Sequence, residues 1–139
     1  MNLAELTEVV QNTARGLKVE SVNWDGDTDF NIQAMQMART RIMIATHGSI
    51  LNHNAFMEAG GVVIEINAYQ FLYPLTSQIV LFRGNHYLRY EANLGNTKHQ
   101  GFPLGHDPFP GISTRRCMSD MECQSSRRDA DVQVDVSDF

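Results

Sequence analysis

A His-Gly-Ser step at residues 47–49 combines three residue types that are suited to binding anions. His47 can donate a hydrogen bond to an oxygen, and Gly48 lets a ligand approach the backbone closely. Ser49 and the amides that follow it can hold a phosphate. The step therefore predicts an anion site, with a nucleotide phosphate as its ligand. The alternative, a plain turn with an ordinary loop histidine, stays open because isolated His-Gly pairs often have that role.

A second candidate, Glu65, stands in the otherwise apolar run 62–66. A carboxylate in such a run needs a partner or a purpose, because ionised side chains are rarely buried alone. Near the end of a strand, Glu65 could accept hydrogen bonds from ribose hydroxyls. A salt bridge to a buried arginine such as Arg41 is the alternative, and the sequence leaves both open.

The remaining histidines, His53, His86, His99 and His106, show no spacing typical of a metal site. We expect each of them on the surface or in a loop, and we expect no metal ion or cofactor. The sequence also lacks the glycine patterns of dinucleotide-binding, P-loop and α/β-hydrolase enzymes, which argues against those three classes.

These residues must be positioned by strands and helices that alternate along the chain. Apolar and β-prone runs predict four strands, and helical periodicity or capping predicts a helix near each of them. This order is typical of a Rossmann-like parallel sheet with crossover helices, an α/β fold. The predicted strands are 19–24, 42–46, 62–66 and 86–90, and the predicted helices are 3–15, 30–39, 50–57 and 74–82. Ligands of such sheets bind beyond the carboxyl ends of the strands, where His47 and Glu65 would lie.

Residues 1–92 are predicted to form this domain, and residues 93–139 a loop-rich, poorly packed extension with scattered glycines and prolines. Alternating valines at 132, 134 and 136 predict a half-exposed edge strand, and its position suggests a truncated sequence. Cys117 and Cys123 lie in the extension, and two cysteines alone leave a disulfide and free thiols both open.

Composition narrows the classes of partner. The chain has 139 residues, of which 42% are hydrophobic, and a formal net charge of −5. One globular domain with an appendage fits this length. The negative charge opposes binding to nucleic acid. No apolar run is long enough to cross a membrane, and no signal peptide or other targeting signal begins the chain, so we expect no membrane contact.

Several short segments occur in the order and spacing of a known family. The chain resembles the C-terminal part of the family 61 glycosyltransferases, which include plant xylan-modifying and animal O-linked N-acetylglucosaminyltransferases. The resemblance covers about residues 15–92, and its pieces are Phe-Asn-Ile-Gln at 30–33, the apolar run 42–46, His-Gly-Ser-Ile-Leu-Asn-His at 47–53, Phe-Met-Glu-Ala-Gly at 56–60 and Val-Val-Ile-Glu at 62–65. Ser49, Asn52-His53 and Glu58-Ala59 depart from the family pattern, and these departures concern the preference for donor or acceptor.

The resemblance implies one half of a two-domain, GT-B-like enzyme that uses a UDP-sugar without an obligatory metal. His47, Gly48 and Ser49 would face the pyrophosphate, and Glu65 the ribose or uracil. The other half would supply the acceptor site and the catalytic base, so the catalytic residues are unknown here. The isolated chain would bind nucleotide weakly and catalyse little.

The same resemblance implies that the intact protein works in the Golgi or endoplasmic reticulum lumen on a glycan or glycoprotein acceptor. Because that compartment is oxidising, it favours a disulfide between Cys117 and Cys123. The alternative function is a non-catalytic α/β module that uses the same loop for another phosphate or a protein partner.

Overall fold

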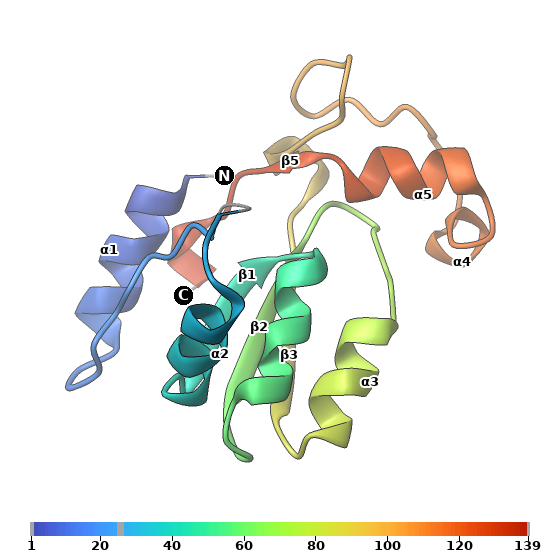
Figure 1. Cartoon of the computed structure of the whole chain (residues 1–139). Helices are drawn as coiled ribbons and strands as arrows, with labels where there is room; N and C mark the ends of the chain where they lie inside the picture. Colours follow the sequence, from blue (N-terminus) through green and yellow to red (C-terminus); the bar gives the residue numbers. More distant parts are fainter. Residues whose placement is uncertain (1, 25–26, 139) are drawn as a thin grey trace.

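The computed structural model describes residues 2–24 and 27–138 and shows a mixed α/β fold (Figure 1). Short helices and strands alternate along the chain. Its elements are α1 (Leu3–Thr13), α2 (Phe30–Ala38), β1 (Ile42–Thr46), η1 (Ser49–Phe56), β2 (Val62–Asn67), α3 (Leu75–Phe82), β3 (His86–Glu91), η2 (Leu94–Asn96), β4 (Thr97–Lys98), α4 (Thr114–Cys117), α5 (Met121–Arg128), β5 (Asp131–Val132) and η3 (Val136–Asp138). The η elements are 3-10 helices, so the helix predicted at 50–57 forms as the more tightly wound 3-10 type over Ser49–Phe56.

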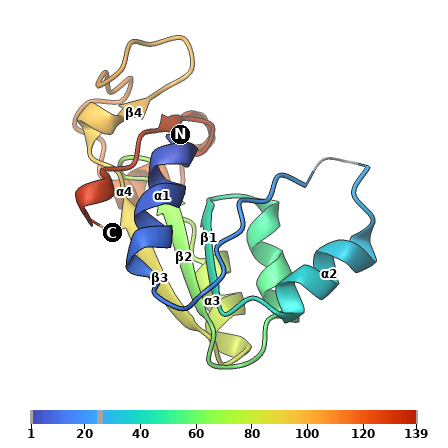
Figure 2. The ribbon, with the colours of Figure 1, turned by 90° about the vertical axis from the view of Figure 1, so that its left-hand side faces the viewer.

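Three parallel strands in the order β1-β2-β3 form the central sheet. Its register aligns Ala45 of β1 with Glu65 of β2, and Glu65 with Arg89 of β3. One face packs under α2, η1 and α3, and α1 lies on the other face (Figure 2). Because the strands are parallel, β1 and β2 end at the same edge of the sheet, and that edge carries the residues of the site.

The prediction of a fourth strand at residues 19–24 is wrong for the part that the structure describes. Residues 17–24 have no ladder partner, and Val22 is exposed. The indole of Trp24 instead donates to Gln36 Oε1 in α2 at 2.7 Å, and its ring contacts that of His53. The end of this segment is therefore held at α2 and η1. The polar turn predicted after Trp24 lies mostly outside the described residues.

The three remaining predicted strands are confirmed, and α1, α2 and α3 match their predictions within two residues at each end. Local signals explain this agreement. Asp29 caps α2, since its side chain accepts a hydrogen bond from the Asn31 amide at 2.7 Å. Pro74 stands directly before α3, where a proline loses no helical hydrogen bond.

The C-terminal part packs more closely than predicted. β4 pairs antiparallel with β5, and Val132 and Val134 enter a core cluster with Leu6 of α1 and Ile66 of β2. The valine alternation therefore produces a strand of two residues, followed by a buried valine. His99 lies in a loop, one of the two places expected for it, but it is fully buried, and its Nδ1 lies 3.1 Å from the Ser126 carbonyl oxygen. Non-local contacts of this kind leave no periodic trace in the sequence.

Two hydrogen bonds, called here the clip, join Asn2 to Val134, which lie far apart in the sequence. The Asn2 side chain donates to the Val134 carbonyl oxygen at 3.0 Å and accepts from the Val134 amide at 2.8 Å. This pair holds the start of α1 beside the segment that follows β5. Leu6 can therefore share one core cluster with residues near the other end of the described chain.

Cys117 and Cys123 form a disulfide that joins α4 to α5, and both are buried. We expect the double variant C117S/C123S to lose about 2 kcal/mol of unfolding free energy, since the crosslink restricts a short loop of the unfolded chain. Urea unfolding of both proteins, with and without a reductant, measures this loss. The reductant should destabilise the native protein and leave the double variant unchanged. Equal stability of the two proteins without reductant would contradict the prediction.

Candidate functional site

The predicted site residues His47 and Glu65 lie together at the carboxyl edge of the sheet. His47 follows β1 directly, and its amide donates to the Ile66 carbonyl oxygen of β2 at 2.9 Å. This bond extends the strand pairing by one residue and fixes the backbone of His47. The His47 Nδ1 atom lies 2.5 Å from Oε1 of Glu65. Two neighbouring strands thus hold the imidazole and the carboxylate in contact.

Glu65 is buried and fully engaged by polar partners. Its side chain is 1% exposed. Thr76 of α3 donates to Oε1 at 3.3 Å, and the Tyr87 hydroxyl of β3 donates to Oε2. The expected alternative partner, Arg41, is wrong, because Arg41 pairs at the surface with Glu58 at 2.7 Å. The burial of the Glu65 carboxylate is therefore explained by its three hydrogen-bond donors, His47, Thr76 and Tyr87.

These partners decide the ionisation of Glu65. Burial raises the pKa of Glu65, but the hydrogen bonds from His47 and Tyr87, the charge of His47 and the bond from Thr76 together lower it below its ordinary value. Burial and the neighbouring Glu65 raise the pKa of Tyr87. At neutral pH Glu65 is thus an anion that only accepts hydrogen bonds, and Tyr87 remains a donor.

The carboxylate also assigns the tautomer of His47. Because Glu65 only accepts, the Nδ1 atom of His47 carries the proton that it donates, and Nε2 is left for other partners. The imidazole packs near the rings of Phe71 and Tyr73, at centroid distances of 4.7 and 5.6 Å. Its side chain is 15% exposed. Nε2 accepts in the neutral ring and donates only when His47 also carries a second proton, so an anionic ligand would meet the imidazolium form, whose charge Glu65 balances.

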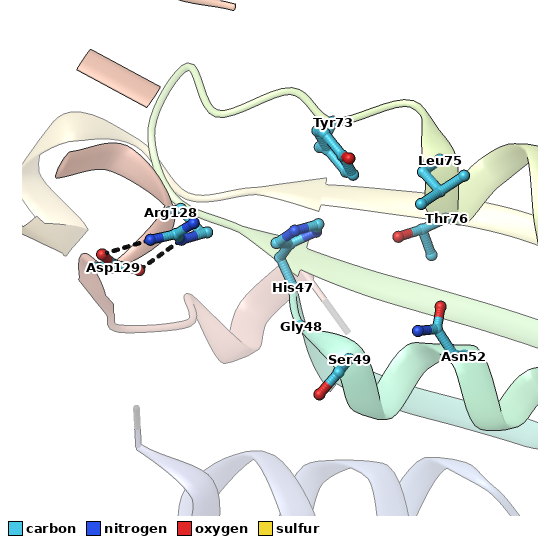
Figure 3. A pocket seen from close by; sticks show the side chains of 9 residues that line it. All are labelled: His47, Gly48, Ser49, Asn52, Tyr73, Leu75, Thr76, Arg128 and Asp129. Atoms are coloured by element: carbon cyan, nitrogen blue, oxygen red, sulfur yellow. Dashed lines mark hydrogen bonds and ion pairs between the residues drawn. The ribbon is translucent and has the colours of Figure 1, made fainter. Parts of the chain in front are cut away.

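A cavity of about 400 Å³ opens beside this histidine (Figure 3). Three segments that are distant in the sequence line it. They are His47, Gly48, Ser49 and Asn52 after β1, Tyr73, Leu75 and Thr76 before and within α3, and Arg128 and Asp129 at the end of α5. The cavity thus lies between the first turns of η1 and α3 and receives a charged pair from the C-terminal part.

The predicted residues differ in what they contribute to this cavity. Gly48 has an extended backbone that any residue could adopt, and an added Cβ would meet no atom within 4 Å. The fold therefore does not require glycine at this position. Figure 3 shows the Ser49 hydroxyl pointing away from His47, while Asn52 points from η1 towards Thr76. Ser49 is not placed as a nucleophile that His47 could activate.

Several residues of this site were not predicted from the sequence. Tyr87 lies on the same face of the sheet as Glu65, so strand alternation together with the register could have found it. Thr76 follows the loop after β2, which is a standard ligand position in parallel sheets. Arg128 and Asp129 come from a polar segment without any pattern, and no signal in the sequence connects them to His47.

In the part of the chain that the structure describes, no group of three histidine, cysteine or acidic side chains could hold a metal ion. Within the same residues, every helix is too short or too polar to cross a bilayer. Comparison with protein families and with curated proteins finds no match to this chain.

Proposed function

We propose that this cavity binds the diphosphate of a UDP-sugar, and that the chain is the donor-binding half of a glycosyltransferase acting on a glycan or protein. One observation carries the proposal. His47 is oriented by a buried carboxylate so that Nε2 is left for a ligand, beside a cavity at the first turns of two helices. The resemblance to family 61 glycosyltransferases supplies the sugar nucleotide, and the geometry supports an anionic group at this point.

The surroundings favour an anion over a neutral ligand. The first amides of a helix lack partners within the helix, and the helix dipole makes this end positive. Gly48 and Ser49 bring the start of η1 to the cavity, and Leu75 and Thr76 bring the start of α3. Arg128 adds a positively charged guanidinium at the same cavity, where it is paired with Asp129. Two helix starts, one histidine and one arginine suit a group that carries several negatively charged oxygens.

The size of the cavity limits how much of the donor it holds. Ligand cavities commonly measure about 300–1,000 Å³, so about 400 Å³ suits part of a nucleotide sugar. Glu65 does not line the cavity, and its oxygens already accept from His47, Thr76 and Tyr87. In our proposal Glu65 therefore positions His47 and makes no contact with ribose.

The proposed chemistry concerns the leaving group. When a sugar is transferred, the bond between its anomeric carbon and the diphosphate breaks, and negative charge grows on the diphosphate oxygens. A protonated His47 would donate Nε2–H to this charge, and Glu65 would stabilise the imidazolium. Preorganised donors of this kind lower the barrier because they need no rearrangement as the charge develops.

Calorimetry with UDP and UDP-N-acetylglucosamine tests the proposal. We expect H47A to weaken UDP binding at least tenfold, because it removes a charge-assisted hydrogen bond worth roughly 1.5–3 kcal/mol. H86A is the matched control, since His86 is exposed in β3 and should leave the affinity unchanged. Absence of heat with every nucleotide sugar, or equal affinity of H47A, would refute the proposal.

A second candidate is a non-catalytic phosphate-binding module, which would use the same anion site and needs no base in either half of a larger enzyme. Among the described residues that line the cavity, the carboxylate is Asp129, and it is already paired with Arg128. A base for an acceptor hydroxyl is therefore not in place within this cavity. Equal affinity for inorganic phosphate and for UDP-sugars would support this alternative, whereas a clear preference for UDP-sugars supports the donor-binding half.

A further inference from the structure

Arg128 is the last residue of α5, and its side chain lines the cavity. It forms a two-point ion pair with the neighbouring Asp129, with Nε to Oδ1 at 2.7 Å and Nη2 to Oδ2 at 3.0 Å (Figure 3). Both side chains line the cavity together with His47 and the two helix starts. The cavity therefore contains a strong cation whose charge is balanced by an internal anion.

The backbone that carries this pair is firmly held. The preceding residue, Arg127, is fully buried. Its Nη1 donates to Gln70 Oε1 at 2.6 Å, its Nη2 lies 3.6 Å from Asp107, and its guanidinium lies 5.6 Å from the Tyr69 ring centroid. Tyr69 and Gln70 belong to the loop after β2 that leads to the cavity wall. Arg127 thus fixes the end of α5 against the sheet edge, and the disulfide ties α5 to α4.

Breaking the ion pair between Arg128 and Asp129 should cost little free energy. The side chains of Arg128 and Asp129 are 54% and 49% exposed. Ion pairs with this exposure contribute little to stability, because water screens them. A guanidinium forms the same two-point contact with phosphate oxygens as with a carboxylate. An anion in the cavity can therefore replace the carboxylate of Asp129 without moving the backbone of α5.

We propose that Arg128 binds the anionic ligand of this cavity and that Asp129 is the internal competitor that the ligand displaces. The identity of the ligand as a diphosphate rests on the proposed function. A ligand can displace Asp129 only if it carries enough negative charge, because it must bind Arg128 more strongly than the carboxylate on the adjacent residue does. A diphosphate meets this condition with several oxygens, whereas a neutral sugar leaves the pair closed.

The competition predicts opposite effects for the two members of the pair. We expect R128Q to weaken binding of UDP and of inorganic pyrophosphate roughly tenfold, since a charged hydrogen-bond donor is lost. We expect D129N to strengthen binding of both ligands about threefold to fivefold, because the competing charge is removed. The double variant R128Q/D129N should bind as weakly as R128Q, since Asp129 acts only through Arg128.

Calorimetry at constant ionic strength and pH measures these affinities, and thermal unfolding checks that each variant is folded. R115Q, a change of an exposed arginine in α4, is the matched control and should bind like the native protein. Weaker or unchanged binding by D129N would overturn the competition. Native affinity of R128Q would overturn its role as the ligand's cation.

These failures differ from a failure of the proposed function. If H47A weakens UDP binding while R128Q and D129N match the native protein, the anion site stands and the exchange at Arg128 is wrong. If neither the native protein nor D129N binds UDP or pyrophosphate, the anion site and the exchange are refuted together. Stronger binding by D129N combined with weaker binding by R128Q supports both.

Discussion

Replacing Glu65 with alanine should lower the free energy of unfolding by about 3–5 kcal/mol, because three donors lose their buried acceptor. His47, Thr76 and Tyr87 all donate to this carboxylate, and no other charged partner reaches it among the contacts described. Urea unfolding at neutral pH measures the loss. E58A is the matched control, since Glu58 pairs with Arg41 at the surface and should change stability by at most about 1 kcal/mol.

The stability that Glu65 contributes should also depend on pH. Its pKa in the folded protein is lowered from its ordinary value of 4.5, so the unfolded chain binds the proton more tightly. This contribution is present above pH 4.5 and disappears as the pH falls through the lower folded value. Unfolding of the native protein and of E65Q between neutral pH and pH 3 should therefore show a smaller difference at acid pH. A difference that is constant or grows towards low pH would contradict this assignment.

Replacing Leu51 with alanine should cost about 2–5 kcal/mol of unfolding free energy, through lost burial and the cavity left behind. Leu51 is 1% exposed and packs with Met43, Val63 and Val80 beneath η1. L81A makes the same chemical change at a leucine that is 62% exposed, and it should alter stability by about 0.5 kcal/mol or less. Urea unfolding of the two variants gives both values. Similar losses in both would show that η1 is not part of a cooperative core.

The L51A variant should also bind nucleotide less tightly. Leu51 anchors η1, and the same short helix places Ser49 and Asn52 at the cavity. A shifted η1 would move these groups even though Leu51 does not line the cavity. Retained affinity in a destabilised L51A would show that the rest of the fold holds the site in place.

The sheet and the position of His47 and Glu65 at its edge could be predicted because their signals are local. The strands at 42–46, 62–67 and 86–91 are compact β-prone runs, and the parallel order places His47 and Glu65 at one edge. The segment 19–24 has similar residue types, yet it pairs with no strand, and Trp24 contacts α2 instead. Intrinsic β-propensity is a weak guide because packing against neighbouring elements can override it.

The rest of the site could not be predicted because it depends on contacts between distant residues. Arg128 and His47 line one cavity, and the neighbouring Arg127 is anchored by Gln70, 57 residues earlier in the sequence. One of the two roles predicted for Glu65 was a salt bridge to Arg41, whereas the register places Tyr87 on the face of Glu65 and Arg41 before the strand. Pairings of this kind are set by tertiary packing, and a single sequence carries no record of them.

The clip between Asn2 and Val134 has a consequence for how the chain acquires its structure. The core cluster around Leu51 draws its members from residues 37–80, whereas the cluster around Leu6 needs Val132 and Val134. A ribosome makes those two valines after every buried member of the first cluster. A nascent chain can therefore close the first cluster early, while the apolar stripe of α1 stays without its partners until Val132 and Val134 have been made.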